Sequence, residues 1–271
     1  MLPVMRILGR VGVLLGGAAA ALAHFAALWL QYRGMPPLRV RAWWLHTWCR
    51  WGVPKLGIEV LAGGGAPAGA LIVANHLSYL DILVLSAHGP VLFVAKREVR
   101  RWPGFGLIAR LAGAIFIERG RVRDLPRVIG EMQSALTAGV PVVLFPEGTT
   151  TDGGSVLAFR SGLFQSAVRA SAPVTPAAIA YEAEGDPGRE ICWWGEMAFL
   201  PHLLNVLAKP RVAAQLEFCM APHVWRSRKL AAILAHEQVT TMVCQLRASK
   251  TKRVAALPQA TLEAAMGVRL G

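Results

Sequence analysis

A histidine and a carboxylate five residues apart, His76 and Asp81, are the residues of this sequence best placed to do chemistry together. A neutral imidazole can take a proton from a hydroxyl when a carboxylate holds its other nitrogen as N–H and stabilises the imidazolium that forms. His76 follows a short apolar run, residues 71–74, with the length and branching of a buried strand. Asp81 lies where a helix is expected to begin, so one turn between strand and helix can supply both groups.

The same turn also fits a purely structural explanation. Ser78 and Asp81 form an S-x-x-D pattern before the apolar residues 82–85, which is typical of a capped helix start. We therefore expect Ser78 to cap this helix, and a histidine in such a loop need have no chemical role. The rest of the chain decides between a catalytic pair and an ordinary helix start.

Composition excludes several classes of protein. Of the 271 residues 54% are hydrophobic, and 29 Lys and Arg against 16 Asp and Glu give a net charge of +13. The mean hydropathy is +0.43 and the pI is about 10.6. A basic chain this apolar suits an anionic membrane surface and phosphorylated lipids, whereas a nucleic-acid partner would require a more polar chain with a recognisable binding motif. The 4 cysteines are scattered without C-x-x-C spacing, which predicts a reducing compartment and neither a disulfide framework nor a metal site.

An uncharged apolar segment at residues 11–30 has about the length needed to cross the ~30 Å hydrocarbon core of a bilayer. Its small residues would also suit a signal peptide. Because basic and aromatic segments follow at once, we expect a retained anchor instead. The arginines on its C-terminal side place that side in the cytoplasm, and a helix lying in one leaflet is the alternative topology.

The next segment, residues 38–51, combines tryptophans and arginines at helical spacing. This pattern fits an interfacial helix with its rings at headgroup depth, and it fits an amphipathic helix packed on the domain equally well. We expect residues 1–55 to form the membrane anchor and interfacial helix, residues 56–247 an α/β domain, and residues 248–271 a basic C-terminal tail.

Short apolar runs alternate with helical patterns from residue 71 onward, with short connections between them. This alternation predicts an α/β fold in which a mixed, largely parallel sheet is flanked by helices. In open α/β sheets, ligands bind outside the carboxyl ends of the strands. Polar residues follow the expected strands directly, and they should therefore meet in one site with a base, two cations and a carboxylate: His76, Lys96, Arg119 and Glu147.

Four separated motifs, taken in order, resemble the 1-acyl-glycerol-3-phosphate acyltransferase (lysophosphatidate acyltransferase) family. They are Asn75-His76 with Asp81, Gly-Ala-Ile-Phe-Ile-Glu-Arg at 113–119, Phe-Pro-Glu-Gly-Thr at 145–149 and Val-Thr-Pro at 174–176. The histidine–aspartate spacing is a weak signal alone, and Phe-Pro-Glu-Gly-Thr at this distance makes it a strong one. Family members commonly carry Asp where this chain has Glu118, and no expected role depends on that exchange.

The resemblance implies an enzyme that moves a fatty acyl group from a thioester of acyl carrier protein or coenzyme A to the hydroxyl of 1-acyl-glycerol-3-phosphate, giving phosphatidate. His76 would be the general base, oriented by Asp81, without a covalent intermediate. A guanidinium can hold phosphate through two hydrogen bonds, and Pro176 would belong to the motif that shapes the acyl pocket. The residues implied to bind or assist with the glycerol phosphate are Lys96, Arg119, Arg121, Glu147, Gly148 and Thr149.

The resemblance also implies the surroundings of the reaction. The partners would be membrane lipids, lysophosphatidate and the thioester donor, with no nucleic acid and no metal or redox cofactor. The protein would lie on the cytoplasmic side of a membrane, which is the inner membrane if the organism is bacterial.

Several alternatives stay open. Arg119 could merely pair with an acidic neighbour, and Glu147 could be a turn carboxylate. Gly148 could serve a turn with positive φ, and Pro176 could be a strand-edge proline. Among enzymes, lyso-ornithine lipid or another lysolipid could replace the acceptor. From another class, a non-catalytic protein could bind anionic membranes through its basic face. A hydrolase is disfavoured because no Gly-x-Ser-x-Gly elbow is present.

Overall fold

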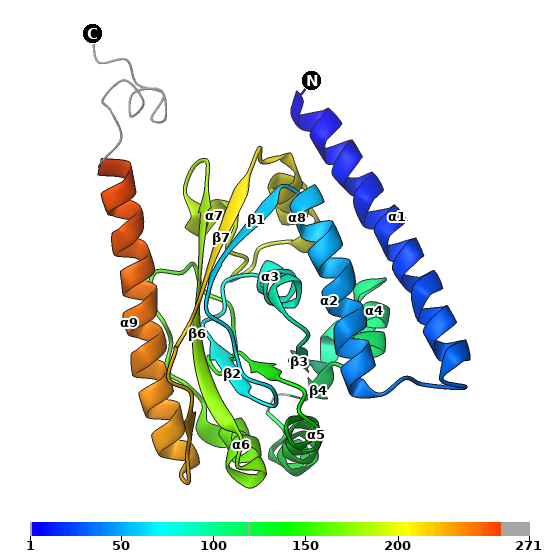
Figure 1. The fold of residues 1–271 in the computed structure, drawn as a ribbon. Helices are drawn as coiled ribbons and strands as arrows, with labels where there is room; N and C mark the ends of the chain where they lie inside the picture. Colours follow the sequence, from blue (N-terminus) through cyan, green and yellow to red (C-terminus); the bar gives the residue numbers. More distant parts are fainter. Residues whose placement is uncertain (1, 119, 256–271) are drawn as a thin grey trace.

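The computed structural model describes residues 2–118 and 120–255, which form a mixed sheet with helices on both faces (Figure 1). The strands are β1 (Ile58–Gly63), β2 (Leu71–Ala74), β3 (Leu92–Lys96), β4 (Ile115–Ile117), β5 (Val142–Leu144), β6 (Pro173–Ala183), β7 (Val212–Phe218) and β8 (His223–Val224). The α-helices are α1 (Leu2–Gln31), α2 (Leu38–Lys55), α3 (Leu80–His88), α4 (Phe105–Ala112), α5 (Leu125–Thr137), α6 (Gln165–Ala170), α7 (Pro187–Glu190), α8 (Phe199–Ala208) and α9 (Arg228–Ala255). Short 3-10 turns are η1 (Arg97–Arg101), η2 (Val122–Asp124) and η3 (Ser161–Phe164).

The sheet has the strand order β1-β7-β6-β2-β5-β3-β4, with β8 paired to β6. From β6 to β4 all neighbours are parallel, whereas β7 and β8 run antiparallel to β6. The predicted α/β fold with a mixed, largely parallel sheet is therefore confirmed. Two strands, β1 and β8, were not predicted. β1 pairs with β7, where Ile58 lies opposite Val212, and a partner so far along the chain leaves no local sequence pattern.

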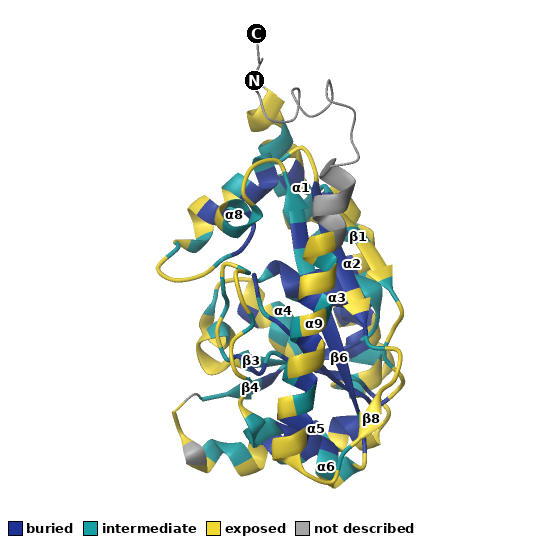
Figure 2. Ribbon diagram, turned by 90° about the vertical axis from the view of Figure 1, so that its left-hand side faces the viewer, coloured by how far each residue is buried: buried dark blue, intermediate teal, exposed yellow. Residues whose placement is uncertain are grey.

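Alternate residues of the central strands face opposite layers of the protein. Ile72 and Ala74 of β2 join the core under α2 and α3, whereas Leu71 and Val73 join the core under α5, α6 and α9. Figure 2 shows β6 buried behind α9, whose outward side is exposed. Burial on both faces explains why these strands are continuous apolar runs in the sequence.

The N-terminal helix α1 is long and apolar enough to cross a membrane, the one such helix within the described residues. It nevertheless lies against the domain, along α2 and α8 (Figure 1). Arg10 donates to the carbonyls of Leu207 and Lys209 at 2.9 and 2.5 Å, and Arg6 donates to that of Ala208 at 2.9 Å. These guanidinium groups complement the negative end of the α8 dipole, so α1 is attached to the end of α8.

The tryptophan-rich helix α2 packs on the domain along one side. Trp44 is 2% exposed and donates its indole N–H to the carbonyl of Ala21 in α1 at 3.0 Å. Trp43 and Trp51 remain 50% and 42% exposed. The helix therefore contributes to the core and also presents aromatic rings at the surface.

The last helix, α9, covers β6 through contacts of Val239 and Val243 with Ala178. It continues to Ala255, so the first residues of the expected C-terminal tail, from 248, are helical. The remainder of that tail, residues 256–271, lies outside the described residues.

Replacing Trp44 with Ala should cost about 3–5 kcal/mol of unfolding free energy, because the cavity it leaves cannot collapse fully. Trp43→Ala is the matched control, and its exposed ring predicts a change of about 0.5 kcal/mol. Denaturant unfolding in detergent measures both. Equal losses for the two variants would show that α2 is not packed as described.

Candidate active site

The site begins at the end of β2, where the side chain of Asn75 continues the hydrogen bonding of that strand to β6. The carboxamide of Asn75 donates to the carbonyl of Ile179 in β6 at 2.9 Å, and its oxygen accepts the Ile179 N–H at 2.8 Å. Asn75 thereby replaces one backbone pair of the ladder. The chain is free to leave the sheet at the next residue, His76, while its starting point stays fixed.

His76 and Asp81 meet as their spacing predicts. Nδ1 of His76 lies 2.8 Å from Oδ2 of Asp81, and the Asp81 side chain is 0% exposed. The same oxygen accepts the N–H groups of Leu77 at 2.8 Å and Ser78 at 3.1 Å. A carboxylate in the first turn of α3 also lies at the positive end of the helix dipole, so the turn holds Asp81 in place from several directions.

The expected capping by Ser78 is wrong. The residue before α3 is Tyr79, no side chain caps the helix, and the buried Ser78 Oγ has no hydrogen-bond partner among the described residues. The turn's N–H groups are instead satisfied by Asp81, which reaches back from inside the helix. A carboxylate is a stronger acceptor than a hydroxyl, and it serves the histidine at the same time.

The imidazole of His76 is held flat against the ring of Phe145. The ring centroids are 4.0 Å apart and the planes differ by 10°. With Nδ1 bound to Asp81, Nε2 is the nitrogen left to accept a proton. The His76 side chain is 17% exposed and lines a cavity, so its position suits a base acting on a bound hydroxyl.

Glu147 braces the turn from the opposite side. It is 4% exposed, its Oε1 accepts the backbone N–H of His76 at 2.7 Å, and its Oε2 accepts that of Leu157 at 2.8 Å. Burial raises the pKa of this carboxyl, and the two backbone hydrogen bonds oppose that rise. Because both oxygens are directed at backbone groups, the structure places Glu147 as a support for His76 rather than at the cavity surface.

The cavity beside His76 has a volume of about 510 Å³. Its walls come from β3, α4 and the start of α8, and they include the aromatic rings of Trp102, Phe105, Trp193 and Phe199. Polar side chains also line the cavity, among them His76, Lys96, Glu118, Arg121, Thr149 and Arg160. A long apolar wall next to a base and several cations suits an amphiphilic substrate with an anionic end.

Most of the residues implied to bind substrate are brought together there. Lys96, Arg121, Gly148 and Thr149 all line the cavity. Arg119 lies outside the described residues. Pro176 is buried in β6 opposite Val73 of β2, within the sheet rather than in the cavity wall.

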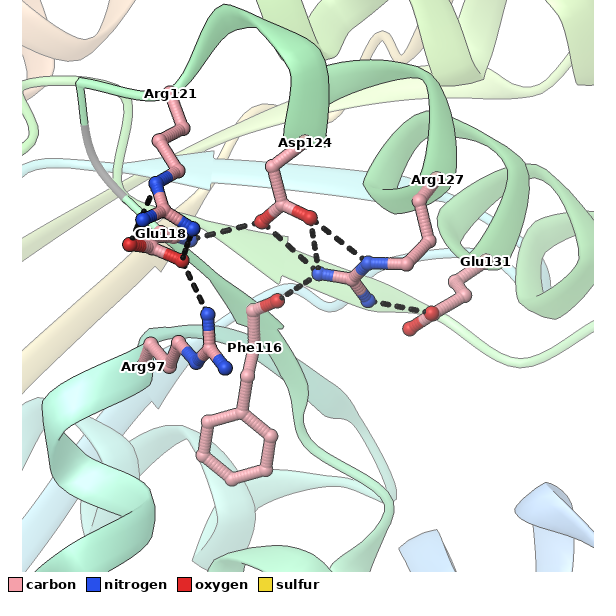
Figure 3. Close-up of polar contacts among 7 residues, drawn as sticks. All are labelled: Arg97, Phe116, Glu118, Arg121, Asp124, Arg127 and Glu131. Atoms are coloured by element: carbon pink, nitrogen blue, oxygen red, sulfur yellow. Dashed lines mark hydrogen bonds and ion pairs between the residues drawn. The ribbon is translucent and has the colours of Figure 1, made fainter.

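The loop after β4 is held by a network of charges, shown in Figure 3. Glu118 accepts from both Arg97 and Arg121, with Nε of Arg121 2.9 Å from its carboxylate. Asp124 accepts the backbone N–H of Glu118 at 2.9 Å and pairs with Arg127 at 2.8 Å. The backbone hydrogen bond, followed by Arg127, lowers the pKa of the Asp124 carboxyl. Glu118 thus shares one negative charge between two arginines at the cavity rim.

Arg160 is a cavity residue that the sequence did not reveal. Its guanidinium lies over the turn glycine Gly148, so that a Cβ built there would be 3.3 Å from Cζ of Arg160. Gly148 has φ +78°, a conformation that also favours glycine. Arg160 makes no ion pair with any residue that the structure describes. It lies in a loop without periodicity, so no local pattern could have indicated its role.

The described residues contain no group of three or more His, Cys, Asp or Glu side chains that could hold a metal ion. The cavity does offer a histidine base backed by a buried carboxylate, together with several cations.

Comparison with known proteins shows which family the chain belongs to. A family model described as Acyltransferase matches residues 62–180. The chain is 38% identical over 206 residues to the lyso-ornithine lipid O-acyltransferase of Rhizobium meliloti (strain 1021), which covers 70% of this chain and 68% of that protein. It is 38% identical over 152 residues to the 1-acyl-sn-glycerol-3-phosphate acyltransferase of Neisseria gonorrhoeae, with 51% of this chain and 59% of that protein covered.

The fold is similar to the crystal structure of the 1-acyl-sn-glycerophosphate (LPA) acyltransferase PlsC from Thermotoga maritima. The TM-score is 0.67 at 21% identity, and the match covers 92% of this chain and 98% of that chain. The sequence relatives, the family model and the motifs around His76 and Glu147 agree. The chain is therefore an enzyme that belongs to the lysophosphatidate acyltransferase family.

Proposed function

We propose that this acyltransferase moves a fatty acyl group from an acyl thioester to the free hydroxyl of a lysolipid, with His76 as general base. The observation that carries the proposal is the 2.8 Å contact between His76 Nδ1 and the buried carboxylate of Asp81, which leaves Nε2 for the substrate. Membership of an acyltransferase family removes the support for a non-catalytic membrane-binding protein.

The chemistry follows from these positions. The acceptor hydroxyl donates its proton to Nε2 of His76 while its oxygen attacks the thioester carbonyl carbon. Asp81 stabilises the imidazolium that forms. The tetrahedral intermediate then collapses, the C–S bond breaks, and His76 returns the proton to the departing sulfur. Either acyl carrier protein or coenzyme A can carry that thioester, and no covalent acyl-enzyme is needed.

For the acceptor we propose 1-acyl-glycerol-3-phosphate, with phosphatidate as the product. Lys96, Arg121 and Arg160 place positive charge on the cavity, and Arg160 has its guanidinium beside the Gly148 turn. A dianionic phosphate monoester is the headgroup that this charge suits best. Lyso-ornithine lipid is the second candidate, because the relative with that name matches a longer part of the chain.

We also propose that the enzyme works on the cytoplasmic side of its membrane, where thioester donors are available. Its apolar helix α1 and its lipid-modifying relatives indicate membrane association. The hydrogen bonds from Arg6 and Arg10 to the end of α8 support an α1 that is retained in the mature protein rather than removed as a signal peptide.

Replacing His76 with Ala should lower kcat/KM for acyl transfer by about 10²–10⁴-fold, because the general base is lost. The assay uses a long-chain acyl thioester with lysophosphatidate. His223→Ala is the matched control, since His223 is exposed on β8 outside the cavity, and its activity should equal that of the wild type. Full activity of His76→Ala would rule out the proposed mechanism.

The acceptor is tested by Arg160→Gln. A hydrogen bond between charged groups contributes about 1.5–3 kcal/mol, so KM for lysophosphatidate should rise about tenfold or more, and KM for lyso-ornithine lipid should change less. Arg169→Gln removes an exposed arginine of α6 that does not line the cavity and serves as the control. If the wild type acylates lyso-ornithine lipid and not lysophosphatidate, the chemistry stands and the second acceptor replaces the first.

A further inference from the structure

The catalytic pair has a neighbour from a distant part of the chain. β2 ends at Ala74, which pairs with Ala177 of β6, but β6 continues to Ala183. The Asn75 side chain extends the pairing as far as Ile179. Tyr181 comes two residues later on the same face of the strand and therefore lies level with the turn that carries the catalytic pair.

The hydroxyl of Tyr181 donates to Oδ1 of Asp81 at 2.6 Å. The other three donors, from His76, Leu77 and Ser78, all bind Oδ2. Tyr181 is therefore the one donor to Oδ1 within the described residues, and the short distance is typical of a hydroxyl bound to a carboxylate. Asp81 is 0% exposed, so water cannot replace this donor without rearrangement.

We propose that Tyr181 is a positioning residue for acyl transfer: its hydroxyl fixes the Asp81 carboxylate so that Oδ2 faces His76, and it moderates the basicity of the imidazole. The inference rests on the proposed role of His76 as general base. Tyr181 itself does not line the cavity and acts only through Asp81.

The state of the phenol fits this role. Burial, and then the adjacent Asp81 charge, raise the pKa of Tyr181 well above its ordinary value, so the hydroxyl keeps its proton at every working pH. Other titratable groups act electrostatically on Tyr181, Asp81 or His76, and the test below leaves all of them unchanged. They are Tyr79 just before α3, Glu147 in the turn after β5, and Cys192 after α7.

Removing the Tyr181 hydroxyl should favour the protonated form of His76. Without Tyr181, the carboxylate concentrates its charge on Oδ2 and binds the imidazole N–H more strongly, which favours the imidazolium. The neutral, active form of His76 is then reached only at higher pH, so the acidic limb of the rate profile moves upward.

The test is kcat/KM for acyl transfer to lysophosphatidate as a function of pH, for the wild type and Tyr181→Phe. We expect the acidic limb to move up by about one pH unit, which is what one hydrogen bond to a charged group amounts to, with KM for the acceptor unchanged. Ile58→Val is the control for packing alone. It trims a 2% exposed side chain in the same core cluster and should lower the melting temperature without moving the limb.

A second measurement needs no catalysis. The pKa of His76 is followed by NMR in detergent, with the resonance assigned by its absence in His76→Ala, and it should be about one unit higher in Tyr181→Phe. Identical His76 titrations in wild type and Tyr181→Phe would overturn the inference. If the wild type transfers no acyl group, the proposed function fails, and the NMR titration still decides the role of Tyr181.

Discussion

The buried negative charge of Asp81 is the constraint on which the rest of the site depends. A carboxylate with no exposed surface has lost its water, and the uncompensated cost of that loss is several kcal/mol. The structure offsets it with donors from the turn backbone, from His76 and from Tyr181. Because these donors come from β6 and from the turn between β2 and α3, they fix the end of β2, the start of α3 and the far half of β6 relative to one another.

The two buried carboxylates of the site bind different parts of the same histidine. Asp81 holds the ring through Nδ1, whereas Glu147 holds the backbone N–H of the same residue and joins it to Leu157. The loop after β5 also donates from Thr151 to the His76 carbonyl at 3.0 Å. The imidazole is thereby oriented through its side chain, its backbone and the stacked ring of Phe145, and little reorganisation is needed before a proton moves.

Sequence reasoning found the parts of this site that are local. His76 and Asp81 share one turn, and residues after β3 and β5 meet them because parallel strands end at the same edge. It was wrong about Ser78, because the pattern cannot show that a carboxylate inside the helix will take the N–H groups that a serine would otherwise cap. For Glu147 the resemblance implied a substrate ligand and the residues alone left a turn carboxylate open, but the partner at Leu157 lies across a loop without pattern and could not be named.

The residues that sequence reasoning missed act over long separations. Tyr181 is 100 positions from Asp81, and its role depends on the register of β6 beside β2. Arg160 reaches Gly148 through the fold of an irregular loop. β1 was overlooked for the same reason, because only the pairing with β7 makes a strand of it. The hydrophobic pattern determines the layers of the sheet, while register and loop paths decide which polar groups meet.

The contact between α1 and α8 makes the anchor part of the enzyme's interior architecture. Phe199 begins α8 and forms part of the cavity wall, and the other end of that helix is held by Arg6 and Arg10 of α1. A foreign hydrophobic segment of equal length could hold the protein at a bilayer, but it would leave the α8 carbonyls without their guanidinium partners. The N-terminal helix is thus not an interchangeable tether, because its arginines hold one end of a helix whose other end forms part of the cavity wall.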